Sequence, residues 1–256
     1  MGVYGYHRNT TPNIDKFSRE AVLFENAFVP RGQTWPSLTS LLTSLYHVST
    51  GVRGNGILMN VSRPTIGSIL SAEGYKTVAF LARYCEAGDL GFDEKYCSQD
   101  PNLVKMSEHW IQKNRGERIF LWMHLFTPHL PYYPCKEYDA FSDEDYAGLY
   151  NGSAEQNKHV YDNRISLAQS DLEHIISRYD GEILETDDDH VRKVLKSLEE
   201  YGMLDSSIVV ITSDHGDELF QHNNFCGHSF SIYDSVLHVP LLVRLPDGRF
   251  AGKRVG

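Results

Sequence analysis

The stretch SSIVVITSDHGDELFQHNNFCGHSF, residues 206–230, joins an apolar run to a cluster of residues that can bind metal ions. The run at 206–212 is rich in β-branched residues and predicts a buried strand. The eighteen residues that follow hold two Asp, one Glu, three His and one Cys. Open α/β folds place their ligand sites at the carboxyl ends of such strands. The stretch therefore predicts an α/β protein with a functional site directly after this strand.

Strand and helix patterns alternate along the rest of the sequence. Apolar runs predict strands at 21–29, 76–82, 118–125 and 239–245. Helical patterns cover 36–45, 64–74, about 101–114 and about 155–201, the last with a break or bend near Gly181. This alternation predicts a mainly parallel central sheet with helices on both faces. No segment has the composition of a linker, so we expect a single domain over residues 1–256.

The charge, the hydropathy pattern and the cysteine count limit the classes of protein to which this sequence can belong. The net charge of −10 argues against nucleic acid as a bulk electrostatic partner. No apolar run approaches the roughly 20 residues that span a bilayer. No basic region followed by an apolar segment marks a signal peptide at the start. The four Cys include no C-x-x-C pair, are too few for a disulfide framework and say little about the redox compartment.

Asp214 and His215 directly follow the strand at the start of the quoted stretch. A carboxylate oxygen and an imidazole nitrogen suit Zn²⁺ or Mn²⁺, and a carboxylate also suits Mg²⁺ or Ca²⁺. His228 lies thirteen residues after His215 and suits three roles: metal ligand, cation for a bound anion, or general acid. Glu218 and His222 are weaker candidates. The alternative is a solvated acidic loop with incidental His.

Thr34 lies just before a helix that has Pro36 in its first turn, within RGQTWPSLTSLLTS at residues 31–44. The N-terminus of a helix offers unpaired N–H groups and a positive dipole end, which suit a tetrahedral oxyanion. A hydroxyl group there can act as a nucleophile if a metal ion lowers its pKa. The alternative is that Thr34 only caps the helix.

Two histidines lie at the end of a predicted strand, in LWMHLFTPHLPYYP at residues 121–134. His124 falls within the strand, where a buried His with satisfied hydrogen bonds is the commoner outcome. His129 lies in a loop that two prolines stiffen, Pro128 and Pro131. Because a rigid loop can aim an imidazole at the edge of the sheet, His129 is a candidate contact for an anion.

These stretches together resemble the sulfatase-like branch of the alkaline phosphatase superfamily. Residues 4–28, YGYHRNTTPNIDKFSREAVLFENAF, are similar to the segment in which that family writes Y-G-Y, T-P-N-x-D and F-x-N-A. TWPSLTSLLTSLYHVSTGVRGNG at 34–56 resembles the nucleophile helix. Three further stretches of this chain resemble the later blocks of the family. They are GYKTVAF at 74–80, FLWMHLFTPHLPY at 120–132, and VVITSDHGDEL with GHSFSIYDSVLHVPLLVRLP within 209–246. Five blocks in the family's order cover nearly the whole chain.

The resemblance implies roles for individual residues. Thr34 stands at the position of the nucleophile, which also contacts the metal ion. Asp214 and His215 match the pair of metal ligands in the S-D-H-G block. His228 matches a position that contacts the leaving group or the transferred anion. His129 matches a His that contacts the anion.

The nucleophile motif departs from that of the sulfatases. Those enzymes carry Cys-x-Pro-Ser-Arg, whose Cys is oxidised to formylglycine, whereas residues 34–38 of this chain read TWPSL. Relatives with a Thr nucleophile are phosphatases, phosphodiesterases and phosphoglycerol or phosphoethanolamine transferases. The resemblance therefore implies a metal-dependent hydrolase of phosphate or sulfate esters that forms a covalent intermediate on Thr34. The alternatives are a transferase of that kind and a non-catalytic protein that binds anions.

The resemblance also implies the cofactor and the substrate class. The cofactor is a divalent ion, Ca²⁺, Mn²⁺, Zn²⁺ or Mg²⁺, and the substrate is a small-molecule, lipid or glycan ester. Arg53 and Glu218 are weaker candidates for contacts near the substrate. The family has a buried strand ending in a metal-ligating Asp just before the Y-G-Y segment, and a smaller C-terminal subdomain. We expect this chain to lack both, with Asp15 beginning a helix rather than replacing that ligand.

Overall fold

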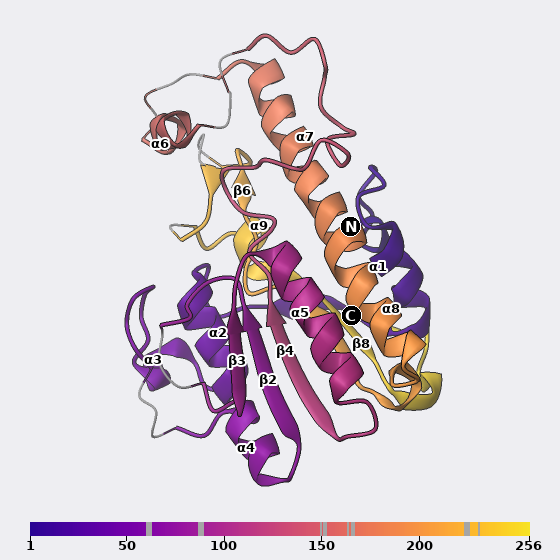
Figure 1. Cartoon of the computed structure of the whole chain (residues 1–256). Helices are drawn as coiled ribbons and strands as arrows, with labels where there is room; N and C mark the ends of the chain where they lie inside the picture. Colours follow the sequence, from indigo (N-terminus) through magenta and orange to yellow (C-terminus); the bar gives the residue numbers. More distant parts are fainter. Residues whose placement is uncertain are drawn as a thin grey trace.

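The strands of the protein form two larger sheets and one short antiparallel pair (Figure 1). The computed structural model describes residues 1–59, 63–86, 90–148, 150, 153–162, 164, 167–222, 226–229 and 231–256. The first sheet is parallel, in the order β3 (Glu94–Cys97), β2 (Lys76–Leu81), β4 (Ile119–His124). The second sheet has the order β5 (Val209–Thr212), β8 (His238–Arg244), β1 (Val22–Phe28), β9 (Arg254–Val255). The short pair consists of β6 (Glu218–Leu219) and β7 (Cys226–Gly227).

The helices predicted at 36–45, 64–74 and about 101–114 begin and end within two residues of the observed bounds, whereas the predicted helical stretch 155–201 is divided among separate helices. Those of the described residues are α1 (Pro12–Phe17), α2 (Thr34–Thr43), α3 (His47–Thr50), α4 (Ile66–Ala72), α5 (Asp100–Lys113), α6 (Ala154–Tyr161), α7 (Gln169–Glu185), α8 (Arg192–Glu200) and α9 (Asp234–Leu237). Within this part of the chain, none of them combines the length and the apolar character that crossing a membrane requires.

In the two larger sheets, β8 is the exception to a mainly parallel architecture. β8 runs antiparallel to both β5 and β1, whereas β1 runs parallel to β9. Among the described residues, β4 pairs only with β2 and β5 only with β8, so each strand leaves one edge unpaired. Their carboxyl ends still approach each other, because His124 Nε2 lies 3.7 Å from Asp214 Oδ2.

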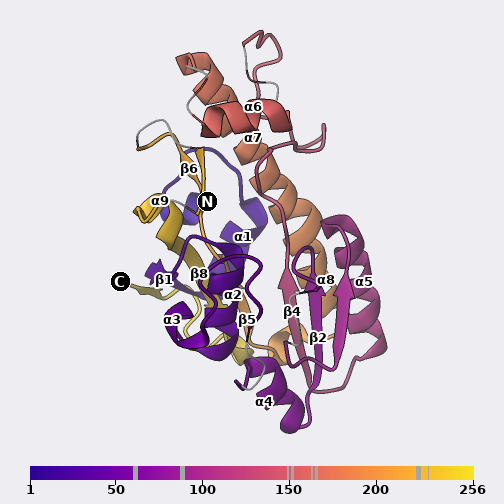
Figure 2. The ribbon, with the colours of Figure 1, turned by 90° about the vertical axis from the view of Figure 1, so that its left-hand side faces the viewer.

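β2 shows why helices cover both faces of the first sheet. Val78 and Phe80 pack against side chains of α5, whereas Ala79 and Leu81 pack against side chains of α2. Because successive side chains of a strand point to opposite faces, a strand buried on both faces reads as a continuous apolar run. Figure 2 shows α5 and α8 on one side of this sheet and α2 and α4 on the other.

Helices α1 and α8 cover the second sheet. Ile14 and Phe17 of α1 are buried in one cluster with Leu242 of β8. Leu195 of α8 and Ile211 of β5 pack at the margin of this cluster. The second sheet is thus anchored to the same long helical segment, α7 to α8, that also packs on α5.

The predicted break near Gly181 is wrong. α7 continues through this residue, and a π-helical turn at Thr186–Val191 joins α7 to α8. Gly181 is buried, and a Cβ there would lie 2.8 Å from Pro134 Cγ and 2.9 Å from the carbonyl oxygen of Tyr138. The glycine therefore permits close contact between α7 and the segment after His129, rather than ending the helix.

Candidate active site

A cavity of about 550 Å³ lies at the carboxyl ends of β2, β4 and β5, next to the start of α2. The five main candidates from the sequence all line it: Thr34, His129, Asp214, His215 and His228. They meet because the carboxyl ends of β4 and β5, from the two larger sheets, approach each other here.

Thr34 is the first residue of α2, and Gln33 occupies the cap position before it. The Thr34 hydroxyl oxygen lies 3.1 Å from His215 Nε2. The residue is largely buried, with 7% of its surface exposed. The hydroxyl thus faces the ligand-rich segment after β5, at the positive end of a ten-residue helix. This contact replaces the interpretation of Thr34 as only a helix cap.

Asp214 contacts two imidazoles. Its Oδ2 lies 3.4 Å from His215 Nε2 and 3.7 Å from His124 Nε2. Burial acts to raise the pKa of Asp214, but the contact with His124 and the charges of both imidazoles outweigh it and lower the pKa to about 2. Asp214 is therefore an ionised carboxylate at neutral pH. His124 was expected to be a structural histidine, and instead it lines the cavity beside Asp214.

Asp217 is a candidate ligand that the sequence did not single out. Its Oδ1 accepts a hydrogen bond from His228 Nδ1 at 2.7 Å, and its Oδ2 accepts one from the Tyr132 hydroxyl at 2.8 Å. Burial acts to raise the pKa of Asp217, but the bond from His228 and that from Tyr132 lower it. The pKa of His228 is raised, because its bond to Asp217 outweighs the opposing effect of burial.

The donors around His215 fit a divalent metal ion. The ligand atoms of His215, Asp217 and His228 lie within 4.8 Å of one another, and Thr34 and Asp214 both approach His215 Nε2. Imidazole nitrogens with carboxylate oxygens are typical of Zn²⁺ and Mn²⁺ sites. Neither carboxylate pairs with a Lys or Arg among the described residues. A cation would neutralise this buried negative charge.

A loop held by buried carboxylates aims His129 at the cavity. Glu182 of α7 accepts hydrogen bonds from the backbone N–H groups of His129 and Tyr133, at 3.0 and 2.6 Å. Asp100, the first residue of α5, holds the preceding part of the loop in the same way. The rings of His129 and His228 meet edge to face, with centroids 5.1 Å apart. Burial lowers the pKa of His129.

The weaker candidates lie outside the cavity lining. Arg53 is exposed, and Asn55 lines the cavity in its place. Glu218 is fully buried and accepts hydrogen bonds from His222 and from two serine hydroxyls. Glu218 therefore braces the segment behind the site. Neither Arg53 nor Glu218 lines the cavity.

Arg83 and Tyr84 line the cavity although sequence reasoning gave them no role. The Arg83 guanidinium carbon lies 4.2 Å from the centroid of the Phe126 ring, which brings a positive charge to the cavity. Tyr84 stacks on Trp35, the residue after Thr34, with ring centroids 5.7 Å apart. Both residues follow the carboxyl end of β2, so the rule that located Asp214 after β5 would have found them too.

Comparisons with known proteins identify relatives of this chain. A family model described as Sulfatase matches residues 1–254. An ulvan-active sulfatase of Formosa agariphila is 24% identical over 286 residues, which cover 96% of this chain and 53% of the relative. An arylsulfatase of Clostridium perfringens is 24% identical over 327 residues, with coverages of 99% and 67%. This chain thus spans between about half and two thirds of the length of these relatives.

A solved structure shows the same fold. The phosphonate monoester hydrolase of Agrobacterium radiobacter superposes with a TM-score of 0.80 at 18% sequence identity, over 100% of this chain and 67% of the hydrolase. The α/β fold predicted from the sequence motifs is therefore confirmed. Since the family model covers nearly all of the sequence, the chain belongs to the sulfatase family.

Proposed function

We propose that the protein is a metal-dependent hydrolase of phosphate or sulfate esters, with Thr34 as its nucleophile. The observation that carries this proposal is the 3.1 Å contact between Thr34 Oγ1 and His215 Nε2 inside the cavity. The start of α2 adds backbone N–H groups and a positive dipole end for a bound oxyanion. The relatives are named as sulfatases and a phosphonate monoester hydrolase, which supports this class of substrate.

The reaction uses the residues of the cavity in two steps. Thr34 Oγ attacks the phosphorus or sulfur atom in line with the leaving oxygen, so that one bond to this atom forms as the other breaks. Water then attacks the same atom and releases Thr34. A divalent ion, when bound, supplies Lewis acidity for the hydroxyl and neutralises charge on the transferred group. Asp214, Asp217 and His215 would hold it.

Cationic and hydrogen-bonding groups receive the transferred anion. His129 is fixed by the carboxylate of Glu182 behind its loop, and Arg83 adds a guanidinium at the cavity wall. His228 is oriented by Asp217, and contacts the anion or the leaving oxygen with its other ring nitrogen. Donors placed before the reaction stabilise charge that develops in the transition state.

Two substitutions distinguish the role of the nucleophile from that of a metal ligand. Thr34→Ala should abolish ester turnover while metal content stays close to that of the wild type, because Asp and His ligands remain. Asp214→Ala should lose both turnover and metal, since it removes an ionised ligand. Thr43→Ala, at the far end of the same helix, is the matched control and should keep both properties. Metal content is measured by elemental analysis of the purified proteins. Undiminished turnover in Thr34→Ala would remove Thr34 as the nucleophile.

The Thr at the nucleophile position also predicts a preference between esters. Residue 34 is not a Cys, so it cannot be converted to formylglycine. We therefore expect bis(p-nitrophenyl) phosphate to be hydrolysed with a higher kcat/KM than p-nitrophenyl sulfate, which has the same leaving group. A clear preference for the sulfate would contradict this interpretation of the motif.

A further inference from the structure

Phe126 lines the cavity and contacts the two side chains that the proposed function assigns to the transferred anion. The Arg83 guanidinium carbon lies 4.2 Å from the centroid of the Phe126 ring. The His129 ring stacks on the same ring, with centroids 4.1 Å apart and planes inclined by 23°. We propose that Phe126 is a positioning residue that holds Arg83 and His129 in place for the anion. This inference rests on the proposed function and adds a residue to the same site.

The register of two parallel strands brings Phe126 to Arg83. Leu81 of β2 pairs with His124 of β4, and the N–H group of Ala82 donates to the carbonyl oxygen of His124 at 3.0 Å. Arg83 and Phe126 each come two residues after this pair. Because side chains two residues apart in extended chain lie on the same face, the pairing of β2 with β4 places these two side chains together at the edge of the sheet.

Buried hydrogen bonds fix the backbone that carries the Phe126 ring. Its N–H group donates to both carboxylate oxygens of Asp100, at 2.9 and 3.0 Å, and the N–H group of Thr127 donates to Asp100 Oδ2 at 2.7 Å. Asp100 is buried, with 4% of its surface exposed. The carbonyl oxygen of Thr127 accepts a hydrogen bond from Thr186 Oγ1 at 3.1 Å. The ring therefore starts from a backbone that α5 and the turn after α7 both hold.

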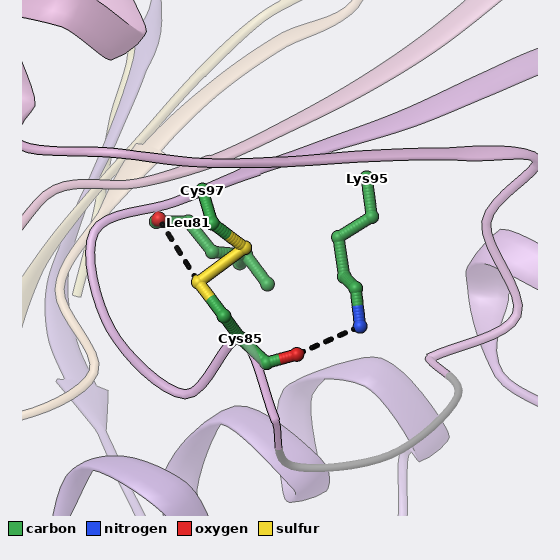
Figure 3. Close-up of a disulfide and its surroundings, with 4 residues drawn as sticks. All are labelled: Leu81, Cys85, Lys95 and Cys97. Atoms are coloured by element: carbon green, nitrogen blue, oxygen red, sulfur yellow. Dashed lines mark hydrogen bonds between the residues drawn. A yellow bond between two sulfur atoms is a disulfide. The ribbon is translucent and has the colours of Figure 1, made fainter.

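The backbone near Arg83 is anchored to β3. Cys85, two residues after Arg83, forms a disulfide with Cys97, the last residue of β3 (Figure 3). The carbonyl oxygen of Cys85 also accepts a hydrogen bond from Lys95 Nζ at 2.8 Å. These contacts restrain the backbone of the turn, but the long side chain of Arg83 has several rotatable bonds of its own. The contact with the Phe126 ring restrains that side chain.

An aromatic ring can hold a guanidinium without using its hydrogen-bond donors. The attraction between the ring face and the cation is electrostatic, so the N–H groups of Arg83 remain available for the oxygens of an anion. Ordering a flexible side chain during binding lowers affinity. Because the Phe126 ring orders Arg83 and His129 before the anion arrives, Phe126 contributes affinity for the anion rather than the rate of the chemical steps.

The test compares Phe126→Leu with the wild type, both loaded with the same divalent metal. The variant removes the ring and keeps an apolar side chain. We expect KM for bis(p-nitrophenyl) phosphate to rise by roughly 5- to 30-fold, the cost of ordering two side chains on binding. Because lost ground-state binding raises KM alone, kcat should change by less than about threefold. Calorimetric titration should show the Kd for inorganic phosphate raised by the same factor as KM.

Three more variants show whether the ring itself is responsible. Phe126→Tyr retains the ring and should keep KM and the Kd for phosphate within about twofold of the wild type. Phe126→Met should repeat the effect of Phe126→Leu, and its flexible thioether fills the space of the ring if the leucine variant does not fold. Phe141→Leu is the matched control, because the Phe141 ring lies 5.6 Å from the Arg8 guanidinium carbon and does not line the cavity. It should leave both constants unchanged.

A double-mutant cycle with Arg83→Met tests whether the ring acts through Arg83. Phe126→Leu should weaken phosphate binding less in the Arg83→Met background than in the wild type, because coupled residues give non-additive effects. Losses that multiply fully in the double variant would show that the ring acts independently of Arg83, and they would refute the positioning role.

The outcomes separate this inference from the proposed function. An unchanged KM in Phe126→Leu, a fall in kcat alone, or an equal loss in Phe126→Tyr would overturn the positioning role and leave the proposed function standing. A wild type that binds no phosphate and hydrolyses no ester would instead overturn the proposed function, and this role with it.

Discussion

Removal of the Cys85–Cys97 disulfide should destabilise the protein by an amount that follows from the structure. The two cysteines are separated by 12 residues in the sequence. In the chain-entropy model, a cross-link that closes a loop of this length lowers the entropy of the unfolded chain by an amount worth about 3 kcal/mol at 25 °C. The double variant Cys85→Ala/Cys97→Ala should therefore have a free energy of unfolding lower by about 3 kcal/mol.

Urea unfolding, followed by circular dichroism under non-reducing conditions, measures this difference. The control is Cys135→Ser. Cys135 is a free cysteine, and its Sγ donates to Glu185, a role that a hydroxyl can retain. Its free energy of unfolding should change by less than about 0.5 kcal/mol.

Two results would refute this reasoning. One is a difference below about 1 kcal/mol between the double variant and the oxidised wild type, since the loop-closure model requires more. The other is a titration of four free thiols in the denatured, unreduced wild type. The structure predicts two, because of the four cysteines only Cys135 and Cys226 are free.

Two further perturbations test the support of the site. Burial raises the pKa of Glu182 from 4.5 to about 7, so its ionisation costs the native state about 3 kcal/mol once the pH exceeds 7. The contribution of Glu182 to the free energy of unfolding is therefore fully present below pH 4.5 and is lost as the pH rises to 7. Glu182→Gln should gain stability relative to the wild type over that range in urea unfolding, and a pH-independent difference would contradict this. Tyr132→Phe removes the donor to buried Asp217 and should lower stability by about 1.5–3 kcal/mol, whereas Tyr46→Phe at an exposed position should not.

Local sequence patterns predicted most of the fold because burial imposes them. Residues 78–81 of β2 are all apolar because α2 and α5 cover the two faces of the strand, and most of β4 shows the same pattern. The direction of β8 could not be predicted, since an apolar run such as 239–245 reads the same in a parallel and an antiparallel strand. Gly181 was misread because a glycine that permits close packing and one that ends a helix look alike in the sequence.

The site was predictable where its residues directly follow strands. Asp214 and His215 come at the end of β5, and one rule of α/β folds locates them. Asp217 and Glu218 could not be told apart in one acidic run. Successive side chains near β6 point in opposite directions, so Asp217 enters the cavity and Glu218 lies behind it. The disulfide also escaped prediction, because the spacing of four cysteines does not reveal which two β2 and β3 bring together.

The central claim is that Thr34 is the nucleophile, and trapping the covalent intermediate tests it most directly. The metal-loaded wild type is mixed with p-nitrophenyl phosphate, quenched in acid within milliseconds, digested and analysed by tandem mass spectrometry. The account predicts a phosphoryl group on Thr34 that is absent from the unreacted protein and disappears when substrate is exhausted. Turnover with Thr34 unmodified throughout, or with the phosphoryl group on another residue such as His215, would contradict it.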